Sequence, residues 1–262
     1  MKIAYLDCFS GVSGDMLVGS LLDAGLPFEE LERIISGLNL NGFKISAKKE
    51  GRNNIFGTRF YVSLKEKDQK ARYLKDIKEI IKSGDIPLAV VEKCISVFEK
   101  LANIEGEIHH VSPDQLHFHE LGAVDSIIDI VASVVGIYLL GIEKLFVSRM
   151  PVGKGIITSA HGKIPLPSPA TIALLKGVPI YDSGQEVEMV TPTGAALITS
   201  LCSSFGPMPS MIVDRVGYGA GSRTLADRPN FLRILIGNDI DKQRSETVVA
   251  LESNLDDMSP EL

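Results

Sequence analysis

Residues 2–25 read KIAYLDCFSGVSGDMLVGSLLDAG, and this stretch sets the expected architecture. Its first residues, Lys2 to Leu6, form an apolar run typical of a buried strand. A turn rich in glycine and serine follows over residues 7–15. From Asp15 to Ala24 the apolar residues predict a helix, which Gly25 ends. The chain is therefore expected to begin with a strand, a glycine-rich turn and a helix.

Similar patterns predict alternating helices and strands along the rest of the chain. Helical spacing of apolar residues predicts helices at residues 27–38, 73–83, 87–105, 126–140, 169–176 and 195–203. Apolar runs predict strands at residues 43–47, 58–64, 144–147, 211–216, 230–236 and 247–251, the first two paired antiparallel around a turn at residues 52–54. This alternation indicates an α/β or α+β fold with a mixed sheet and helices.

The composition of the 262 residues excludes several classes of protein. Apolar residues make up 45% and charged residues 23% of the chain, as in an ordinary globular protein and unlike a collagen, coiled coil or disordered chain. Lys plus Arg is 27 and Asp plus Glu is 33, which leaves a net charge of −6. Because non-specific binding to nucleic acid or to an anionic membrane needs a basic face, we expect neither partner.

The cysteines and the apolar segments indicate where the protein works. Cys8, Cys94 and Cys202 lie far apart and form no disulfide framework, so we expect a reducing compartment. The start of the chain has no apolar run long enough for a signal peptide. The apolar stretch at residues 127–142 is interrupted by Asp129 and is too short to span a bilayer. These features predict a cytoplasmic protein.

Histidines are concentrated in one short stretch. Residues 109–119 read HHVSPDQLHFH, and Glu120 follows. In an extended segment His117 and His119 point the same way, so together they could hold one transition-metal ion. The candidate metal ligands are therefore His109, His110, His117 and His119. The alternative is a histidine-rich surface loop, or histidines that end the helix before it.

Two aspartates mark the start of the apolar helix after this stretch. Asp125 and Asp129 are four residues apart and can share a helix face. Asp125 is predicted to cap the helix at its N-terminus. Asp129 lies among apolar residues, where a buried carboxylate needs a partner or a function.

Three glycine-rich segments are candidates for binding an anion. The turn at residues 7–15 and the Thr-Pro-Thr-Gly segment at 191–194 each precede a helix, whose free N–H groups can hold a phosphate. The segment at 217–223, GYGAGSR, allows close backbone approach and ends in an arginine. The candidate binding residues are Ser10, Gly11, Ser13, Gly14, Thr191, Thr193, Gly194 and Arg223. Alternatively, these turns only connect elements, and Ser13, Thr191 or Thr193 cap helices. Together the segments indicate a polar small-molecule site.

Five motifs in this order resemble one family. They are LDCFSGVSGDM (6–16), HFHELGAVDSIIDI (117–130), PVGKGIITSAHGKIPLPSPAT (151–171), EMVTPTGAAL (188–197) and GYGAGSR (217–223). They resemble the nickel insertion proteins that complete the nickel-pincer nucleotide cofactor of lactate racemase. The motifs are long and unusual, and they cover nearly the whole chain.

The resemblance implies a CTP-dependent cyclometallase. Such an enzyme inserts nickel into pyridinium-3,5-bisthiocarboxylic acid mononucleotide, where the metal bonds to two sulfurs and one ring carbon, and CTP is cleaved to CMP and pyrophosphate. Forming the nickel–carbon bond requires loss of a ring proton. The candidate bases are Asp7, Asp15, Glu120 and Asp125, and the sequence does not distinguish among them.

The resemblance also implies a division of the chain. Residues 1–246 are expected to form the N-terminal region, as one or two closely packed subdomains, and residues 247–262 to begin a C-terminal domain. That later domain is associated with CTP and with Mg or Mn. This chain alone is therefore expected to be incomplete as an enzyme, with the C-terminal domain of the same protein as a partner.

Two other functions fit the residues. A nickel storage or chaperone module would use the histidines without chemistry. A magnesium-dependent phosphate-handling hydrolase would use Asp7 and the glycine-rich turns, although no complete phosphate loop is present. The sequence leaves the oligomeric state open, a homo-oligomer included.

Overall fold

The computed structural model describes residues 1–64, 72–116, 118, 123–159 and 162–240. The helices are α1 (Gly14–Asp23), α2 (Phe28–Ser36), α3 (Leu74–Lys82), α4 (Leu88–His109), η1 (Pro113–Gln115), α5 (Val124–Leu139), α6 (Pro169–Leu174) and α7 (Pro192–Leu201). The strands are β1 (Lys2–Asp7), β2 (Phe43–Arg52), β3 (Ile55–Leu64), β4 (Lys144–Val147), β5 (Met150–Val152), β6 (Ile156–Ser159), β7 (Gly162–Pro165), β8 (Ile180–Asp182), β9 (Ser204–Phe205), β10 (Met211–Ala220) and β11 (Phe231–Asp239).

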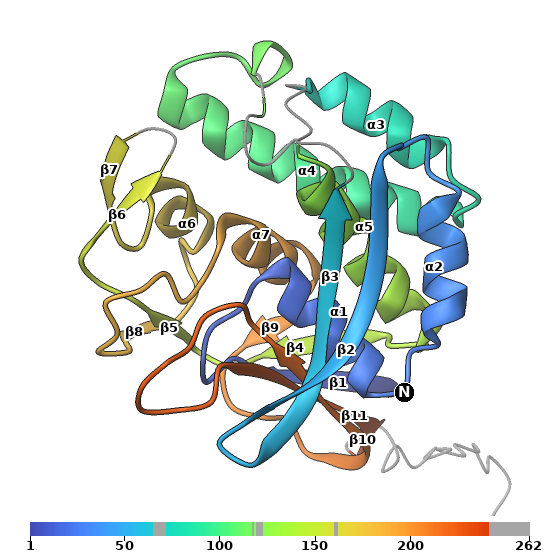
Figure 1. Ribbon diagram of the computed structural model, residues 1–262, viewed down its shortest axis with the longest axis vertical. Helices are drawn as coiled ribbons and strands as arrows, with labels where there is room; N and C mark the ends of the chain where they lie inside the picture. Colours follow the sequence, from blue (N-terminus) through green and yellow to red (C-terminus); the bar gives the residue numbers. More distant parts are fainter. Residues whose placement is uncertain (65–71, 117, 119–122, 160–161, 241–262) are drawn as a thin grey trace, which may run out of the picture.

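A mixed sheet organises the described part of the chain (Figure 1). It has seven strands in the order β2-β3-β10-β11-β1-β4-β9. β1 pairs antiparallel with β11 and parallel with β4, while β10 pairs antiparallel with β11 and parallel with β3. Two small two-stranded sheets, β5-β8 and β6-β7, lie outside it. The predicted α/β class with a mixed sheet is confirmed.

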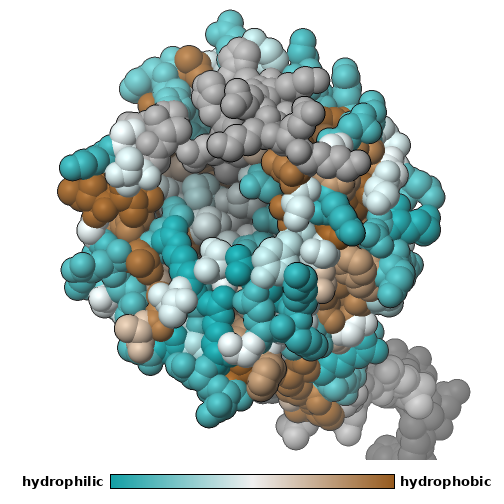
Figure 2. All heavy atoms as spheres, viewed as in Figure 1, coloured by the Kyte–Doolittle hydropathy of each residue, from teal (hydrophilic) through white to brown (hydrophobic). Residues whose placement is uncertain are grey.

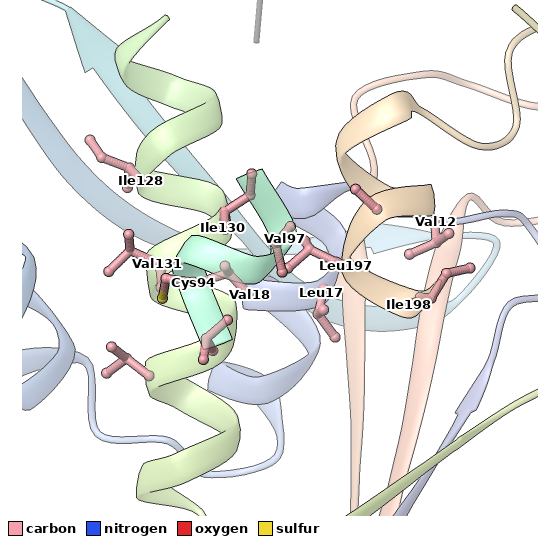
Figure 3. Packing of buried hydrophobic residues seen from close by; sticks show 14 of the residues in the cluster. Val12, Leu17, Val18, Cys94, Val97, Ile128, Ile130, Val131, Leu197 and Ile198 are labelled. Carbon is pink, nitrogen blue, oxygen red and sulfur yellow. The ribbon is translucent and has the colours of Figure 1, made fainter. Parts of the chain in front are cut away.

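Helix α1 lies between this sheet and the other helices. It packs on β10, β3 and β11 on one side, and α5 and α7 contact it on the other. Helix α4 packs on both α5 and α7. Figure 3 shows Leu17 and Val18 of α1 among apolar side chains of these three helices. Because both α1 residues are fully buried, the helix that follows the first turn is held as part of the core.

Glycines in β10 explain why α1 lies so close to the sheet. A Cβ at Gly219 would overlap the backbone oxygen of Met16, and a Cβ at Gly217 would overlap that of Ser20. The sequence placed residues 217–223 among the glycine-rich turns, and this is wrong for its first four residues, because β10 continues to Ala220. These two glycines give the helix room to pack.

Other predicted elements match with shifted ends. The hairpin β2–β3 is longer than expected, since its strands run on to a two-residue turn at Asn53 and Asn54, both with left-handed backbone (φ 49° and 64°). Helix α4 extends one turn further, to His109. The strand predicted at residues 247–251 lies outside the described residues. In the described part of the chain, no helix has both the length and the apolar character needed to cross a membrane.

Candidate functional site

Three segments that are distant in the sequence meet around one hollow of about 120 Å³. They come from the turn between β1 and α1, the segment before α7, and the segment between β10 and β11. Five of the residues predicted to bind or react line it: Ser10, Ser13, Asp15, Thr191 and Arg223. Figure 2 shows hydrophilic side chains gathered over the middle and lower part of the face it presents. The fold therefore joins the three glycine-rich segments into one polar site.

Backbone hydrogen bonds hold two of these segments together. The N–H of Val12 donates to Met189 (3.0 Å), and the N–H of Thr191 donates to Val12 (3.1 Å). Gly11 has a left-handed backbone (φ 91°), and a Cβ there would overlap Met189. A Cβ at Gly194 would come within 2.8 Å of the backbone carbon of Val12. Neither glycine lines the hollow, so their role in the described structure is to let the two backbones touch.

The two helix N-termini at the hollow differ in how they are capped. Thr191 caps α7, because its hydroxyl oxygen accepts a hydrogen bond from the N–H of Gly194 (3.1 Å), as the capping alternative predicted. Thr193 lies buried in the first turn. Ser13 occupies the N-cap position of α1, but the predicted side-chain cap is wrong. Its hydroxyl donates to the carboxylate of Asp15 instead.

Asp15 and Asp129 form a half-buried acidic pair at the start of α1. A Cβ at Gly14 would lie 2.7 Å from Oδ2 of Asp129, so glycine is needed for this carboxyl to reach the helix. Burial raises the pKa of Asp129 well above its usual value, and the neighbouring Asp15 and Asp125 raise that pKa further. Burial also raises the pKa of Asp15, against the opposing effect of the Ser13 hydroxyl. Both carboxyls therefore favour the protonated form more than exposed aspartates do.

Arg223 lines the hollow, and hydrogen bonds from neighbouring segments hold this residue in place. Its guanidinium donates to the backbone oxygen of Glu188 (3.2 Å) and lies 3.3 Å from the side-chain carboxylate of the same residue. Arg52, at the end of β2, donates to the backbone oxygens of Gly221 (2.5 Å) and Arg223. Asn230 also donates to the oxygen of Arg223 (2.9 Å). Glu188, Asn230 and Arg52 were not among the predicted site residues, because the residues around each of them in the sequence do not indicate a binding site.

Two aspartates proposed as bases lie apart from this hollow. Asp7 forms an ion pair with Arg233 of the adjacent strand β11 and does not line the hollow. Asp125 is exposed in the first turn of α5. The prediction that it caps this helix is wrong, since the helix begins two residues earlier than predicted and Ala123 is its N-cap. Glu120 lies outside the described residues.

The histidine stretch is described only in part. His109 is the last residue of α4, with its Nε2 3.4 Å from Oε2 of Glu105, and His110 ends the helix in a left-handed conformation (φ 56°). This matches the alternative in which histidines end the helix. His117 and His119 lie outside the described residues. Within the described ranges, no three side chains of His, Cys, Asp or Glu gather in a way that could hold a metal ion, so the proposed ligand set stays a prediction.

Known proteins resemble this chain over its whole length. The family model described as "Nickel insertion protein" matches residues 4–262. Proteins from two strains of Desulfitobacterium hafniense, DCB-2 and Y51, are each 47% identical over 267 residues and are named pyridinium-3,5-bisthiocarboxylic acid mononucleotide nickel insertion protein. The match covers all of this chain and 66% of each relative. A protein of Syntrophobacter fumaroxidans is 46% identical, with 67% of its length covered. The chain thus spans about two thirds of the length of these relatives, and no solved structure matches it.

Proposed function

Because this chain belongs to the nickel insertion protein family, we propose that it is the N-terminal part of a CTP-dependent enzyme that inserts nickel into pyridinium-3,5-bisthiocarboxylic acid mononucleotide. The product is the nickel-pincer nucleotide cofactor of lactate racemase. Nickel is a substrate of this reaction. The relatives named for this substrate are 47% identical to the chain.

One observation supports a particular binding site for the proposed substrate. Three of the motifs that resemble the family, at residues 6–16, 188–197 and 217–223, are far apart in the sequence and meet at the same hollow. The hollow offers hydroxyl groups, an arginine and two carboxyl groups, those of Asp15 and Glu188. A mononucleotide presents a phosphate to such donors and a ring to the reacting groups. We assign the substrate to this hollow, with its phosphate toward Arg223.

Other components complete the proposed reaction. We propose that the histidines at 109, 110, 117 and 119 collect nickel, since imidazole binds this ion well and can release it. CTP and its Mg²⁺ or Mn²⁺ are assigned to the part of the relatives that this chain does not span. The cysteines in the described structure are free thiols, which fits work in the reducing cytoplasm.

The proposal is tested by reconstituting the reaction. This chain, the remaining third of a relative, CTP, Mn²⁺, nickel and the thiocarboxylate mononucleotide are combined, and nickel–sulfur absorbance and activation of lactate racemase are followed. We expect both signals only when the two protein parts are present. The same signals from the remaining third alone would contradict the proposal. Nickel bound to this chain without insertion in the complete mixture would favour a storage module instead.

Substrate affinity should depend on Arg223. In the variant Arg223→Ala we expect substrate binding, measured by calorimetry, to weaken by about 10- to 100-fold, the equivalent of one charge-assisted hydrogen-bonded contact. Arg33→Ala is the matched control, because Arg33 is exposed on α2 and only reaches Asp85 at 3.8 Å. Equal affinities of the two variants would show that the substrate phosphate does not bind beside Arg223.

A further inference from the structure

One carboxyl oxygen of Asp129 is buried without a use in the described structure. Oδ2 of Asp129 lies against the first turn of α1, 2.7 Å from the position that a Cβ at Gly14 would occupy. The other oxygen, Oδ1, is buried and has no hydrogen-bond partner among the described residues. Leaving such an oxygen unpaired is unfavourable, because it loses its hydrogen bonds to water and gains no partner. Capping alone does not account for this residue, because one acceptor atom is enough for that role.

The second carboxyl of the pair reaches the hollow. Asp15 lines it, and its Oδ1 accepts hydrogen bonds from the Ser13 hydroxyl and from the N–H of Met16 (3.0 Å). The cation that acts on Asp15 is Arg59 of β3. Arg59 is itself engaged with Glu50 at 3.5 Å and stacks 4.6 Å from the Tyr61 ring centre. Asp15 and Asp129 thus lie close together without a cation bonded to either in the described structure, an arrangement that favours one shared proton.

The proposed substrate supplies a reason for such a pair. Its thiocarboxylates stand at ring positions 3 and 5, as the relatives' name states. A nickel ion held by both groups therefore lies beside ring carbon 4, which carries a hydrogen. If the nickel bonds to that carbon, the electron pair of the C–H bond becomes the nickel–carbon bond and the metal stays divalent. One proton must leave, and no oxidant or reductant is needed.

We propose that Asp15 takes up this ring proton as a catalytic base, and that Asp129 is the positioning residue that keeps the pair at one negative charge. This inference rests on the proposed function. The ionised carboxylate of Asp15 accepts the proton, so the pair passes from one proton to two. The proton then leaves to water through the hollow. Asp129 carries the first proton of the pair, so its uncharged carboxyl lies against Gly14 and Asp15 remains the ionised base.

The test compares isosteric variants in the reconstituted reaction. In Asp15→Asn we expect the insertion rate at saturating substrate to fall about 100-fold, as for loss of a general base, with substrate affinity unchanged. Substrate carrying deuterium at ring carbon 4 should react more slowly than the protiated form in this variant. Asp15→Glu should restore part of the rate, since it keeps a carboxylate. Asp85→Asn is the matched control, because the Asp85 side chain is 96% exposed beside Arg33 of α2 and should leave the rate unchanged.

A pH profile separates the two members of the pair. Asp129→Asn should leave the acid limb of the insertion rate at the wild-type pH, because the amide is as uncharged as the protonated carboxyl that it replaces. The charged groups that face the pair from the described elements are Arg59 on β3 and Asp125 on α5. A normal rate in folded Asp15→Asn, or an acid limb that Asp129→Asn moves to lower pH, would overturn the inference while the wild-type protein still inserts nickel. Failure of the wild-type protein to insert nickel would overturn the proposed function instead.

Discussion

Replacing Gly219 by alanine is expected to destabilise the protein by about 3 kcal/mol, the upper range for overpacking a filled core. The added Cβ would overlap the backbone oxygen of Met16 and would also come within 2.6 Å of the backbone nitrogen of Ser20. Neither atom can turn away as a side chain can. Helix α1 must then move off β10, and with it the turn that carries Ser13 and Asp15 into the hollow.

The sign of this effect makes the measurement decisive. In a strand without such a contact, glycine to alanine stabilises by about 0.5–1 kcal/mol. Urea unfolding followed by circular dichroism should show a lower midpoint in Gly219→Ala with the same slope. Arg215→Val, at an exposed position of the same strand, is the control and should change stability little. A midpoint at or above that of the wild-type protein would show that α1 does not lie directly on this strand.

Replacing Asp129 by asparagine is expected to make the protein more stable than the wild type at pH 8, because the amide stays uncharged where the carboxyl is desolvated. Burial raises the pKa of Asp129 in the folded state, with Asp15 and Asp125 adding to the effect. The folded protein therefore binds a proton more tightly than the unfolded chain does. The stability that this proton provides is complete below the unfolded pKa of about 4 and is lost as the pH rises through the folded pKa.

The pH dependence of unfolding checks this sign. The wild-type protein should lose stability over the pH range above that in which an exposed aspartate titrates, and Asp129→Asn should show a flatter curve. Asp182→Asn is the control, because the N–H of Gly184 lowers the pKa of Asp182 and that group stays ionised over this range. Parallel curves for wild-type protein and Asp129→Asn would mean that the Asp129 carboxyl is not desolvated in solution. A stabilising change at this position would also fit a residue kept for function at a cost in stability.

Most elements of the fold could be predicted from the sequence because their signals are local. Helix α5, for example, follows from a long apolar segment, and α1 from apolar spacing between a glycine-rich turn and Gly25. The ends were less predictable. Strand β10 runs through glycines that resemble a turn, since glycine serves equally where a chain turns and where a helix packs closely.

The candidate site could be predicted only as separate pieces. Ser10, Ser13, Asp15, Thr191 and Arg223 were each proposed from their own segments, and all five line the hollow. Asp7 was proposed from the same kind of local pattern, but in the structure it forms an ion pair with Arg233. Arg52 was not predicted as part of the site, because its hydrogen-bond partners, Gly221 and Arg223, are about 170 residues away in the chain.

The sequence by itself determined the kinds of element, the family motifs and the residue types available for chemistry, because periodicity, turn preferences and motif spacing act over a few neighbouring residues. Only the tertiary structure decided which of those residues meet. The packing of α1 between β10 and α5 brings Asp129 to Asp15, and the pairing of Val12 with Val190 brings Thr191 to Ser13. Such contacts depend on how distant backbones fit against each other, and no local pattern encodes that fit.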